Sequence, residues 1–375
     1  MNQYKKVCRY IFRKYEEFMI SFKLKHIVLQ HRDLLSIGSY KVLKTEKVLI
    51  FLNDGAVLQF IEKNYQNFSK RRRSKSGEIF DLFFKFEIVD APNSDYSGQL
   101  LMLTKDRDIK IFDFNNSQVL TLYKDPEKIS QIRHAFAMLS PFFDHTLIRY
   151  SREGYQIEEL INQRQYNELS DVEKNHVFKT LVRQYIRYFS TLDCAVFPVV
   201  TADKLCRQLK VEIPERVFQC FEKFLLESKF KSISWKRVFL HGDLNGSNIL
   251  LHGEKIKLID FERAKSYVFI YDIFNYIYVE QVSGGNCFFL RSYYNGEYDV
   301  LLRDLFAQFD LSYDGDMKTE YMLLFLAERL LEKGFSRRWV NNEVLLFLRE
   351  IEKLHDERKS CLQTNATRIN KKVLF

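Results

Sequence analysis

The chain has 375 residues, 46% of them hydrophobic and 15% aromatic, which is enough for one large core or two medium ones. It contains no run of 18 apolar residues, so no membrane-spanning helix is expected. Its six cysteines are scattered without metal-binding spacing, and the N-terminus lacks the apolar stretch of a signal peptide. These features favour a cytoplasmic protein with reduced thiols.

The formal charge of +9 is concentrated near the N-terminus, because residues 1–124 hold 22 Lys and Arg against 14 Asp and Glu. The sharpest concentration is a basic cluster made of Lys70, Arg71, Arg72, Arg73 and Lys75. The simpler interpretation of this cluster is a solvated loop between strands. The alternative is contact with an anionic glycan or with an anionic membrane, which would place the protein at the inner face of that membrane. Nucleic acid is disfavoured as a partner, since no recognised binding motif accompanies the charge.

The first predicted elements are a helix and a set of strands. Residues 3–24 have apolar side chains at helical spacing beside Lys and Arg, which predicts an amphipathic helix that packs on the core or lies on a membrane surface. The segments 39–61 and 78–90 have the composition of strands, with a turn predicted at Asp54-Gly55.

A compact three-strand meander is predicted next, over residues 100–104, 109–114 and 118–123. The residues at 115–117, Asn-Asn-Ser, supply the turn between the last two strands. A helix then begins at Asp125-Pro126, since Asp is a good cap and proline is favoured at the first helical position.

The remainder of the chain is predicted to be mostly helical. After a strand-like run at 154–161, Ser170 and Glu173 form a capping box at the start of a long amphipathic helix. Further helices are predicted over 298–310, 318–333 and 341–355. We expect Gly334 to end the second of these helices.

Between these helices lies the most informative stretch of the sequence, residues 240–262, which read LHGDLNGSNILLHGEKIKLIDFE. His241 and Asp243 open a short loop, Asn248 closes it, and Asp260 follows an apolar strand. The pattern between Asn248 and Asp260 predicts a β-hairpin with a tight turn at 252–254. The hairpin would bring the amide of Asn248 near the carboxylate of Asp260.

This spacing suits phosphoryl transfer. Asn248 and Asp260 could share one Mg²⁺, which retains waters and phosphate oxygens as its other ligands. Asp243 would be placed to accept a hydrogen bond from a substrate hydroxyl. Each residue by itself could equally be a turn-forming cap, but the whole set in register favours a catalytic loop.

The stretch resembles the aminoglycoside phosphotransferase and choline kinase superfamily, which shares the fold of protein kinases. HGDLNGSNIL is similar to its catalytic loop, IDFERA to its metal-binding segment, and residues 271–276 with Glu280 to a segment of choline and ethanolamine kinases. The resemblance implies Asp243 as catalytic base, Asn248 and Asp260 as Mg²⁺ ligands, His241 as a residue that positions the loop, and Asp272 as a structural tie to it. Choline kinases commonly carry Asn where Gly242 stands, so the substrate subgroup stays open.

The resemblance also implies the fold class, which is α+β: a bilobal protein-kinase-like fold with a small antiparallel β lobe, a larger helical lobe and an N-terminal extension. We place the basic extension with its strands at 1–97, the small nucleotide-binding lobe and hinge at 98–161, and the helical catalytic lobe at 162–375. ATP and Mg²⁺ are the expected cofactors, and the backbone of 154–161 is the expected adenine contact.

Three further residues are expected to contact the nucleotide or to support that contact. Lys124 follows the third meander strand, where kinases place the lysine that pairs with phosphates, and Glu127 is the acid of the next helix that could hold it. The loop 104–108 contains no glycine, so Lys105 or Arg107 is expected to contact phosphate through its side chain.

The predicted activity is ATP-dependent phosphorylation of a hydroxyl on a small molecule or a cell-surface glycan precursor, with a sugar or polyol preferred. One alternative is an amino-alcohol kinase of the choline and ethanolamine type, because several Tyr residues and Glu280 after the metal segment could surround a cation. The same aromatic residues could instead stack on a sugar or simply pack in the core. A second alternative, a non-catalytic kinase-like interaction module, is kept open by the absence of a glycine-rich loop.

Overall fold

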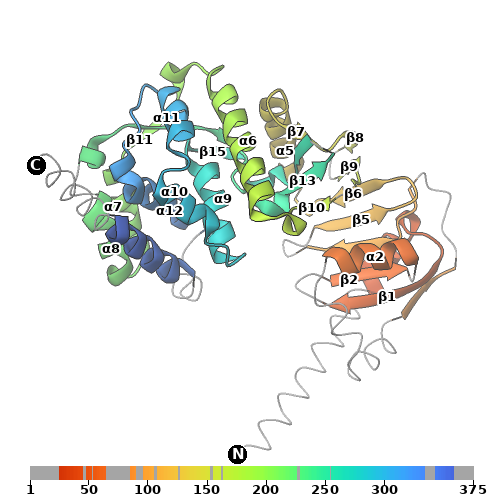
Figure 1. Ribbon diagram of the computed structural model, residues 1–375. Helices are drawn as coiled ribbons and strands as arrows, with labels where there is room; N and C mark the ends of the chain where they lie inside the picture. The colour runs from red at the N-terminus through yellow and green to blue at the C-terminus, as the bar shows by residue number, and fades with distance from the viewer. Residues whose placement is uncertain are drawn as a thin grey trace, which may run out of the picture. The chain divides into compact units, whose positions relative to one another are not determined.

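The computed structural model describes residues 25–44, 48–52, 54–64, 85–89, 96–104, 108–125, 127–152, 155–161, 164–225, 229–253, 255–333 and 343–358 (Figure 1). The chain divides into two compact units. One, here called the sheet unit, comprises residues 1–130 and 146–162. The other, called the helical unit, comprises residues 131–145 and 163–375.

The sheet unit is built on one antiparallel sheet with the strand order β3-β1-β2-β4-β5-β6-β9-β8. Its strands are β1 (Gly38–Lys44), β2 (Val48–Leu52), β3 (Lys85–Ile88), β4 (Leu100–Leu103), β5 (Ile109–Asp113), β6 (Gln118–Leu122), β8 (Ile148–Arg152) and β9 (Tyr155–Glu159). The meander predicted from the sequence is thus confirmed as β4, β5 and β6. Asp113 fixes its last turn, because the Asp113 carboxylate accepts hydrogen bonds from the backbone and side chain of Asn116 at 3.0 and 2.8 Å.

The two faces of this sheet bury different apolar clusters, as strand alternation requires. Tyr40, Ile50 and Leu101 belong to one cluster, and Leu49, Phe51 and Leu100 to the other. The pairing of β2 with β4 joins strands from the first two parts of the three-part division drawn from the sequence. That division stays a prediction.

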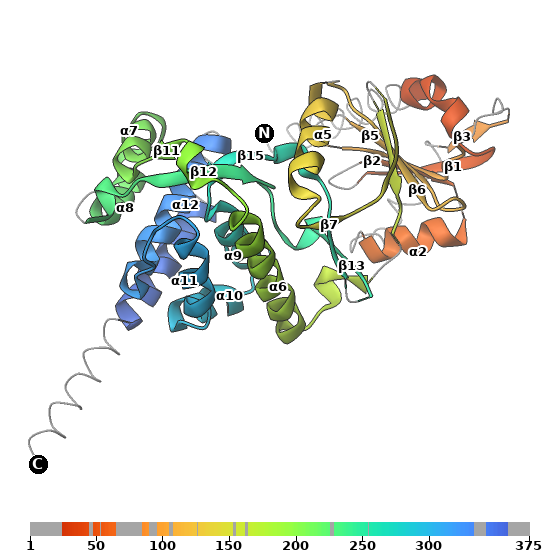
Figure 2. The same cartoon turned by 90° about the horizontal axis from the view of Figure 1, so that it is seen from above.

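The second face is covered by α2 (Gly55–Asn64), which corrects the prediction of strands over 39–61 (Figures 1 and 2). Val57 and Ile61, four residues apart, are fully buried in its apolar cluster. The predicted turn at Asp54-Gly55 is the start of this helix, where Asp54 accepts a hydrogen bond from the Ala56 N–H at 2.9 Å. A short apolar run fits strand and helix alike, and burial against the sheet decides here.

The helix predicted after the meander is α5 (Glu127–Leu139), which crosses the division between the two units. The remaining long helices belong to the helical unit: α6 (Asp171–Phe189), α7 (Ala202–Glu212), α8 (Glu215–Leu225), α9 (Tyr271–Val282), α10 (Phe288–Asn295), α11 (Asp299–Ala307), α12 (Lys318–Lys333) and the helical residues 345–358. Within that unit α12 packs on α7, α8 and α9 (Figure 2). Gly334, the predicted end of α12, lies outside the described residues.

Two small sheets complete the helical unit, in the orders β10-β13-β14-β7 and β11-β12-β15. The strands are β7 (Asp144–His145), β10 (Arg164–Gln165), β11 (Val199–Val200), β12 (Trp235–Leu240), β13 (Ile249–His252), β14 (Lys255–Leu258) and β15 (Lys265–Val268). The predicted hairpin is confirmed as β13 and β14, paired from Ile249–Leu258 to His252–Lys255. With the helices and the sheet of the other unit, this establishes the α+β class.

The predicted capping box of α6 is also confirmed. The Ser170 hydroxyl accepts from the Glu173 N–H, and the Glu173 carboxylate accepts from the Ser170 N–H at 2.8 Å. The predicted apolar face of α6 is buried through Phe178, Leu181 and Tyr185. The helix therefore presents one continuous face to the core of the helical unit.

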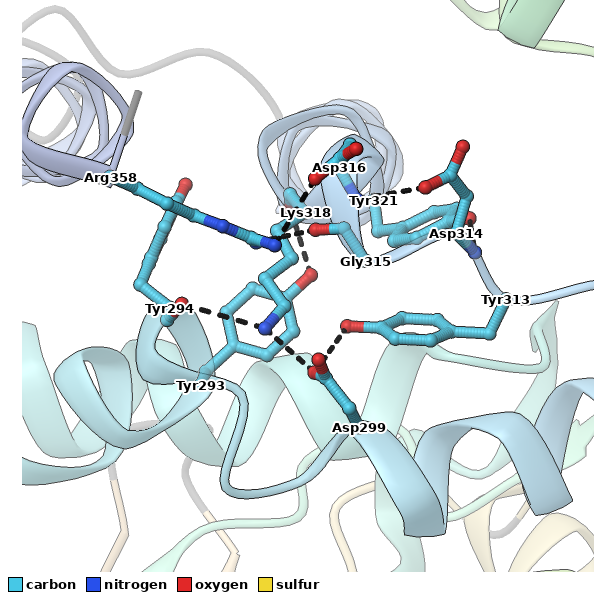
Figure 3. Close-up of polar contacts among 10 residues, drawn as sticks. All are labelled: Tyr293, Tyr294, Asp299, Tyr313, Asp314, Gly315, Asp316, Lys318, Tyr321 and Arg358. Carbon is cyan, nitrogen blue, oxygen red and sulfur yellow. Dashed lines mark hydrogen bonds and ion pairs between the residues drawn. The ribbon is translucent and has the colours of Figure 1, made fainter. Parts of the chain in front are cut away.

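A buried ion pair connects α11 to α12 (Figure 3). Lys318 is 1% exposed, and its ammonium lies 2.6 Å from the Asp299 carboxylate, which also accepts from the Tyr313 hydroxyl at 3.1 Å. Burial lowers the pKa of Lys318, whereas Asp299 acts to raise it. Arg358 pairs with Asp316 at 3.3 Å and thus attaches the C-terminal helical residues to the same region. Each of these charges has an opposite charge as its partner, so the cluster stabilises the packing of α11 against α12.

Removing one partner of this pair should cost stability. We expect Lys318→Met to lower the free energy of unfolding by roughly 2–3 kcal/mol, because it leaves Asp299 partly buried without its cation. Urea denaturation followed by tryptophan fluorescence measures this loss. Lys353→Met is the control, since Lys353 is more than half exposed and its pair with Glu357 is 3.9 Å long. A Lys318→Met variant as stable as Lys353→Met would contradict the assignment.

Candidate active site

The loop 241–248 connects β12 to β13 and forms the centre of the candidate site. Its last residues are the short helical turn η5 (Gly246–Asn248), which leads directly into the hairpin. Across the hairpin, the Ile259 N–H donates to the Asn248 carbonyl at 3.1 Å. Asp260, the next residue, precedes the turn η6 (Phe261–Arg263). Hairpin pairing therefore places the backbone of Asn248 beside Ile259, the residue before Asp260.

The contacts of Asp243 and Asn248 orient both side chains. The Asn248 amide nitrogen donates to the Asp243 carbonyl at 2.8 Å and lies 3.4 Å from the Asp243 carboxylate. This leaves the Oδ1 end of the amide for a cation. Asn245 donates to the same Asp243 carbonyl at 2.8 Å, while its own oxygen accepts from the Ser247 N–H at 2.9 Å. Asp243 itself is half-buried, so its carboxylate is held by the loop and still reachable.

His241 joins the loop to the hairpin. Its ring is fully buried, Nδ1 accepts from the Asp243 N–H at 3.3 Å, and Nε2 lies 2.9 Å from the Ile259 carbonyl. Because Nδ1 is an acceptor, Nε2 carries the proton and donates to that carbonyl. The ring thus links the N–H of Asp243 to the residue that precedes Asp260. These contacts support the positioning role expected for His241.

Asp272, near the start of α9, ties down the start of the loop. Its two carboxylate oxygens accept from the N–H groups of His241 and Gly242, each at 2.9 Å, and one also accepts from the Tyr185 hydroxyl at 2.5 Å. Burial raises the pKa of Asp272, and these hydrogen bonds oppose the shift. The structural tie that the resemblance implied for Asp272 is confirmed.

Gly242 cannot be replaced without disturbing this arrangement. Its φ of +77° lies in the left-handed region, and a Cβ atom built on it would lie 2.2 Å from the Arg263 carbonyl oxygen. The Tyr267 hydroxyl would be 2.8 Å away. Asp260 also has a positive φ of 67°, a conformation that Asp tolerates better than most residues.

Some of the predicted site residues lie outside the helical unit, which holds the loop. Lys124 and Glu127 lie in the sheet unit, and both are exposed. Lys124 follows β6 by two residues, and its backbone N–H donates to the Asp108 carboxylate at 2.9 Å. Lys105 and the basic cluster Lys70, Arg71, Arg72, Arg73 and Lys75 lie outside the described residues. The roles proposed for all these residues stay predictions.

The sheet unit contains an ion pair that no sequence pattern indicated. Asp108 is 1% exposed and pairs with the Lys128 ammonium, from the first turn of α5, at 2.7 Å. Asp108 immediately precedes β5, and Lys128 lies one residue after Glu127. Only the pairing of β4 with β5 reveals that Asp108 is buried at the end of the loop, a fact that no local pattern signals.

The aromatic residues considered for an acceptor pocket prove to be core residues. Each is at most 4% exposed: Tyr267, Tyr271, Tyr276, Tyr278, Tyr293 and Tyr294. Glu280 is 6% exposed and lies 3.7 Å from the Lys174 ammonium. Burial raises the pKa of Glu280, and Lys174 opposes the shift. Packing therefore accounts for these side chains without a ligand.

Asn248 and Asp260 form a sparse ligand set for a metal. Within the described ranges, no group of three or more His, Cys, Asp and Glu side chains is arranged to hold a metal ion. One amide oxygen and one carboxylate nevertheless fit Mg²⁺, which dehydrates reluctantly and takes most other ligands from waters and phosphates.

No helix among the described residues has the length and apolar character needed to cross a membrane.

Comparison with known proteins places this loop in a wider class. The model of the phosphotransferase enzyme family matches residues 199–296, a segment that contains His241, Asp243, Asn248, Asp260 and Asp272. The resemblance drawn from the sequence and the predicted enzyme class, a phosphotransferase, are confirmed over this segment. None of the curated proteins matches the chain.

Solved structures with similarity to the chain include three phosphotransferases. The amicoumacin kinase hAmiN, in complex with AMP-PNP, Ca²⁺ and Ami, is 16% identical over 67% of this chain and 85% of its own, with a TM-score of 0.41. The macrolide 2′-phosphotransferase MphH from Brachybacterium faecium is 16% identical over 61% and 84%, with a TM-score of 0.41. The aminoglycoside phosphotransferase APH(3″)-Id from Streptomyces rimosus is 13% identical over 60% and 90%, with a TM-score of 0.36.

The geometry at Gly242 gives a direct test. Gly242→Asn should destabilise the protein by roughly 1–3 kcal/mol, because the added Cβ meets backbone that cannot easily move. Gly253→Asn is the matched control, since Gly253 also has a positive φ, +61°, but has no atom within 4 Å of the added Cβ. Thermal unfolding compares the two variants. Equal melting temperatures would show that the backbone of Arg263 does not approach Gly242 closely.

A buried acid supports the paired strands β12 and β15, the first of which leads into the loop. Glu328 of α12 accepts from the Val268 N–H at 2.9 Å and lies 2.8 Å from the Arg237 guanidinium. Burial raises the pKa of Glu328 to about 7, although Arg237 opposes the shift. Glu332 and Lys265, which pair with each other, also act on this carboxyl, the first raising its pKa and the second lowering it.

This shift predicts a pH dependence of stability. A carboxyl whose pKa is higher in the folded state than in the unfolded state favours folding while it is protonated, and that contribution is lost as the pH rises through about 7. Wild type should therefore lose a few kcal/mol of stability between about pH 5 and 8 that Glu328→Gln does not lose. Urea midpoints at several pH values measure the difference, with Glu357→Gln, at an exposed acid, as the control. Parallel curves for wild type and Glu328→Gln would contradict the assignment.

Proposed function

We propose that this protein is an ATP- and Mg²⁺-dependent phosphotransferase that phosphorylates a hydroxyl group of a small molecule. The observation that carries the proposal is the position of Asp243. It is half-buried, its carbonyl is held by two amide side chains, and its N–H donates to a buried histidine. A carboxylate fixed in this way, beside the amide of Asn248, suits the acceptor side of phosphoryl transfer.

The residues have separate roles in the proposed reaction. Asp243 would accept the proton of the acceptor hydroxyl as the acceptor oxygen bonds to the γ-phosphorus of ATP and the bond to the β-phosphate oxygen breaks, leaving ADP. Asn248, through Oδ1, and Asp260 would hold Mg²⁺, which neutralises charge on the phosphates when bound. His241 would keep Asp243 and the hairpin in register, because its ring bonds to both.

For the acceptor, we favour a sugar or polyol hydroxyl, which a glycan precursor could carry. The amino-alcohol alternative relied on aromatic faces around a cation, and the tyrosines considered for that role are buried in the core. The positive charge of residues 1–124 favours an anionic acceptor or one bound to an anionic surface. The burial of the tyrosines removes aromatic contact with a cation and with a sugar ring alike, so the charge is the observation that supports the preference.

The role of Asp243 can be tested by a near-isosteric change. Asp243→Asn should lower the turnover number about 10²–10⁴-fold and leave ATP binding and folding nearly unchanged, because it removes the proton acceptor. Hydrolysis of ATP with Mg²⁺, and transfer once an acceptor is known, are the measurements. Asp310→Asn is a surface control, since Asp310 is exposed on the turn after α11. A variant that keeps more than about half of the wild-type rate would exclude Asp243 as the base.

The acceptor class is decided by a transfer screen. ³¹P NMR of the protein with ATP, Mg²⁺ and pools of sugars, polyols or amino alcohols would detect a new phosphate ester in the pool that holds an acceptor. We expect an ester in the sugar or polyol pool. An ester formed only with amino alcohols would overturn the preference and leave the phosphotransferase proposal intact.

A further inference from the structure

A second hydrogen bond attaches the catalytic loop to α9. In the first attachment the side chain from α9 accepts, and in the second it donates. Asp272 accepts from two N–H groups at the start of the loop, whereas Asn275 donates its side-chain N–H to the Leu244 carbonyl at 2.8 Å. Leu244 is the residue that follows Asp243. Because Asp272 and Asn275 are three positions apart, they lie on one face of the helix and hold the backbone on both sides of Asp243.

Asn275 is itself held by a buried arginine. Arg329 of α12 donates through Nη1 to the Asn275 Oδ1, and its guanidinium lies 4.7 Å from the centre of the Tyr278 ring. Arg329 is 5% exposed and Asn275 is fully buried. The adjacent acid, Glu328, is paired with Arg237. In the part of the chain that the structure describes, Arg329 forms no ion pair, and its Nε has no hydrogen-bond partner.

A guanidinium buried without a carboxylate is costly, and here the Asn275 oxygen, the Tyr278 ring and the nearby Tyr271 hydroxyl are the groups that compensate for its lost hydration. An apolar side chain of similar size would pack there at lower cost. The charge of Arg329 fixes the orientation of the Asn275 amide. It fixes the Asn275 oxygen toward α12 and therefore the Asn275 nitrogen toward the loop, and a charged donor polarises the amide so that its own donated bond is stronger.

We propose that Arg329, acting through Asn275, positions the segment that carries Asp243 and so sets the orientation of its carboxylate. The inference rests on the proposed function of Asp243. Arg329 and Asn275 are positioning residues that do not contact substrate. The route runs from α12 to α9 and then to the Leu244 carbonyl, through two hydrogen bonds among buried groups.

The sharpest test is Asn275→Asp, which separates packing from positioning. The aspartate has the same shape and would form an ion pair with Arg329, so the fold should be kept. It cannot donate to the Leu244 carbonyl and would place a carboxylate oxygen against it. Hydrogen–deuterium exchange in the peptide that spans 241–248 should rise about tenfold, and the turnover number for Mg²⁺-dependent ATP hydrolysis should fall about tenfold, with KM for ATP changed less than about twofold.

Two changes at Arg329 complete the test. Arg329→Met removes the charge and should have the same effects as Asn275→Asp, whereas Arg329→Lys keeps a donor for the Asn275 oxygen and should restore most of the turnover. Lys318→Met is the matched control, because it removes another buried cation of α12 that has no contact with the loop. It should lower the unfolding midpoint and leave loop exchange and turnover per folded molecule unchanged.

Failure of the positioning role and failure of the proposed function give different results. Unchanged loop exchange in folded Asn275→Asp and Arg329→Met, or increased exchange in Lys318→Met to the same degree, would overturn the positioning role. Increased exchange in Asn275→Asp, in a protein whose wild type hydrolyses no ATP, would support the positioning role and count against the proposed function. If Arg329→Met does not fold, Asn275→Asp alone decides.

Discussion

The site depends on one constraint, which is that a buried carboxylate on α9 binds the backbone at the start of the catalytic loop. Asp272 accepts from the N–H groups of His241 and Gly242, and these two residues have little other means of satisfying buried donors. The positive φ of Gly242 then turns the chain that follows this contact toward Asp243. From that anchor, the ring of His241 fixes Asp243 and the end of β14 together. A core helix thus determines the geometry of an accessible acid.

Much of this could be predicted from the sequence, wherever short-range patterns determine structure. The hairpin β13–β14 and the meander β4–β6 combine β-rich runs with turn residues, and the start of α6 has a complete capping box. The grouping of Asn248 with Asp260 followed from the hairpin alone. The tie from Asp272, 29 residues beyond Asp243, was not visible as a pattern and came only through the resemblance to a family.

The rest could not be predicted because it depends on long-range packing. The run that includes Val57 and Ile61 fits a strand as well as a helix until the apolar sheet face below it is known. The pairing of Asp108 with Lys128 needs the pairing of β4 with β5 and the position of α5. The need for glycine at position 242 comes from Arg263, a residue that is distant in sequence from the loop turn. In each case the deciding partner is brought close by the fold.

The central claim is that this loop and hairpin bind ATP with Mg²⁺ for phosphoryl transfer. Thermal unfolding of wild type and Asp260→Ala, with ATP, with Mg²⁺ and with both, tests it most directly. Ligand at 100 times its dissociation constant adds roughly 2.7 kcal/mol of stability, which raises the melting temperature by several degrees. The account predicts this rise for wild type only when ATP and Mg²⁺ are both present, and a much smaller rise for Asp260→Ala. No rise for folded wild type at millimolar ATP and Mg²⁺, or an equal rise for both proteins, would contradict it.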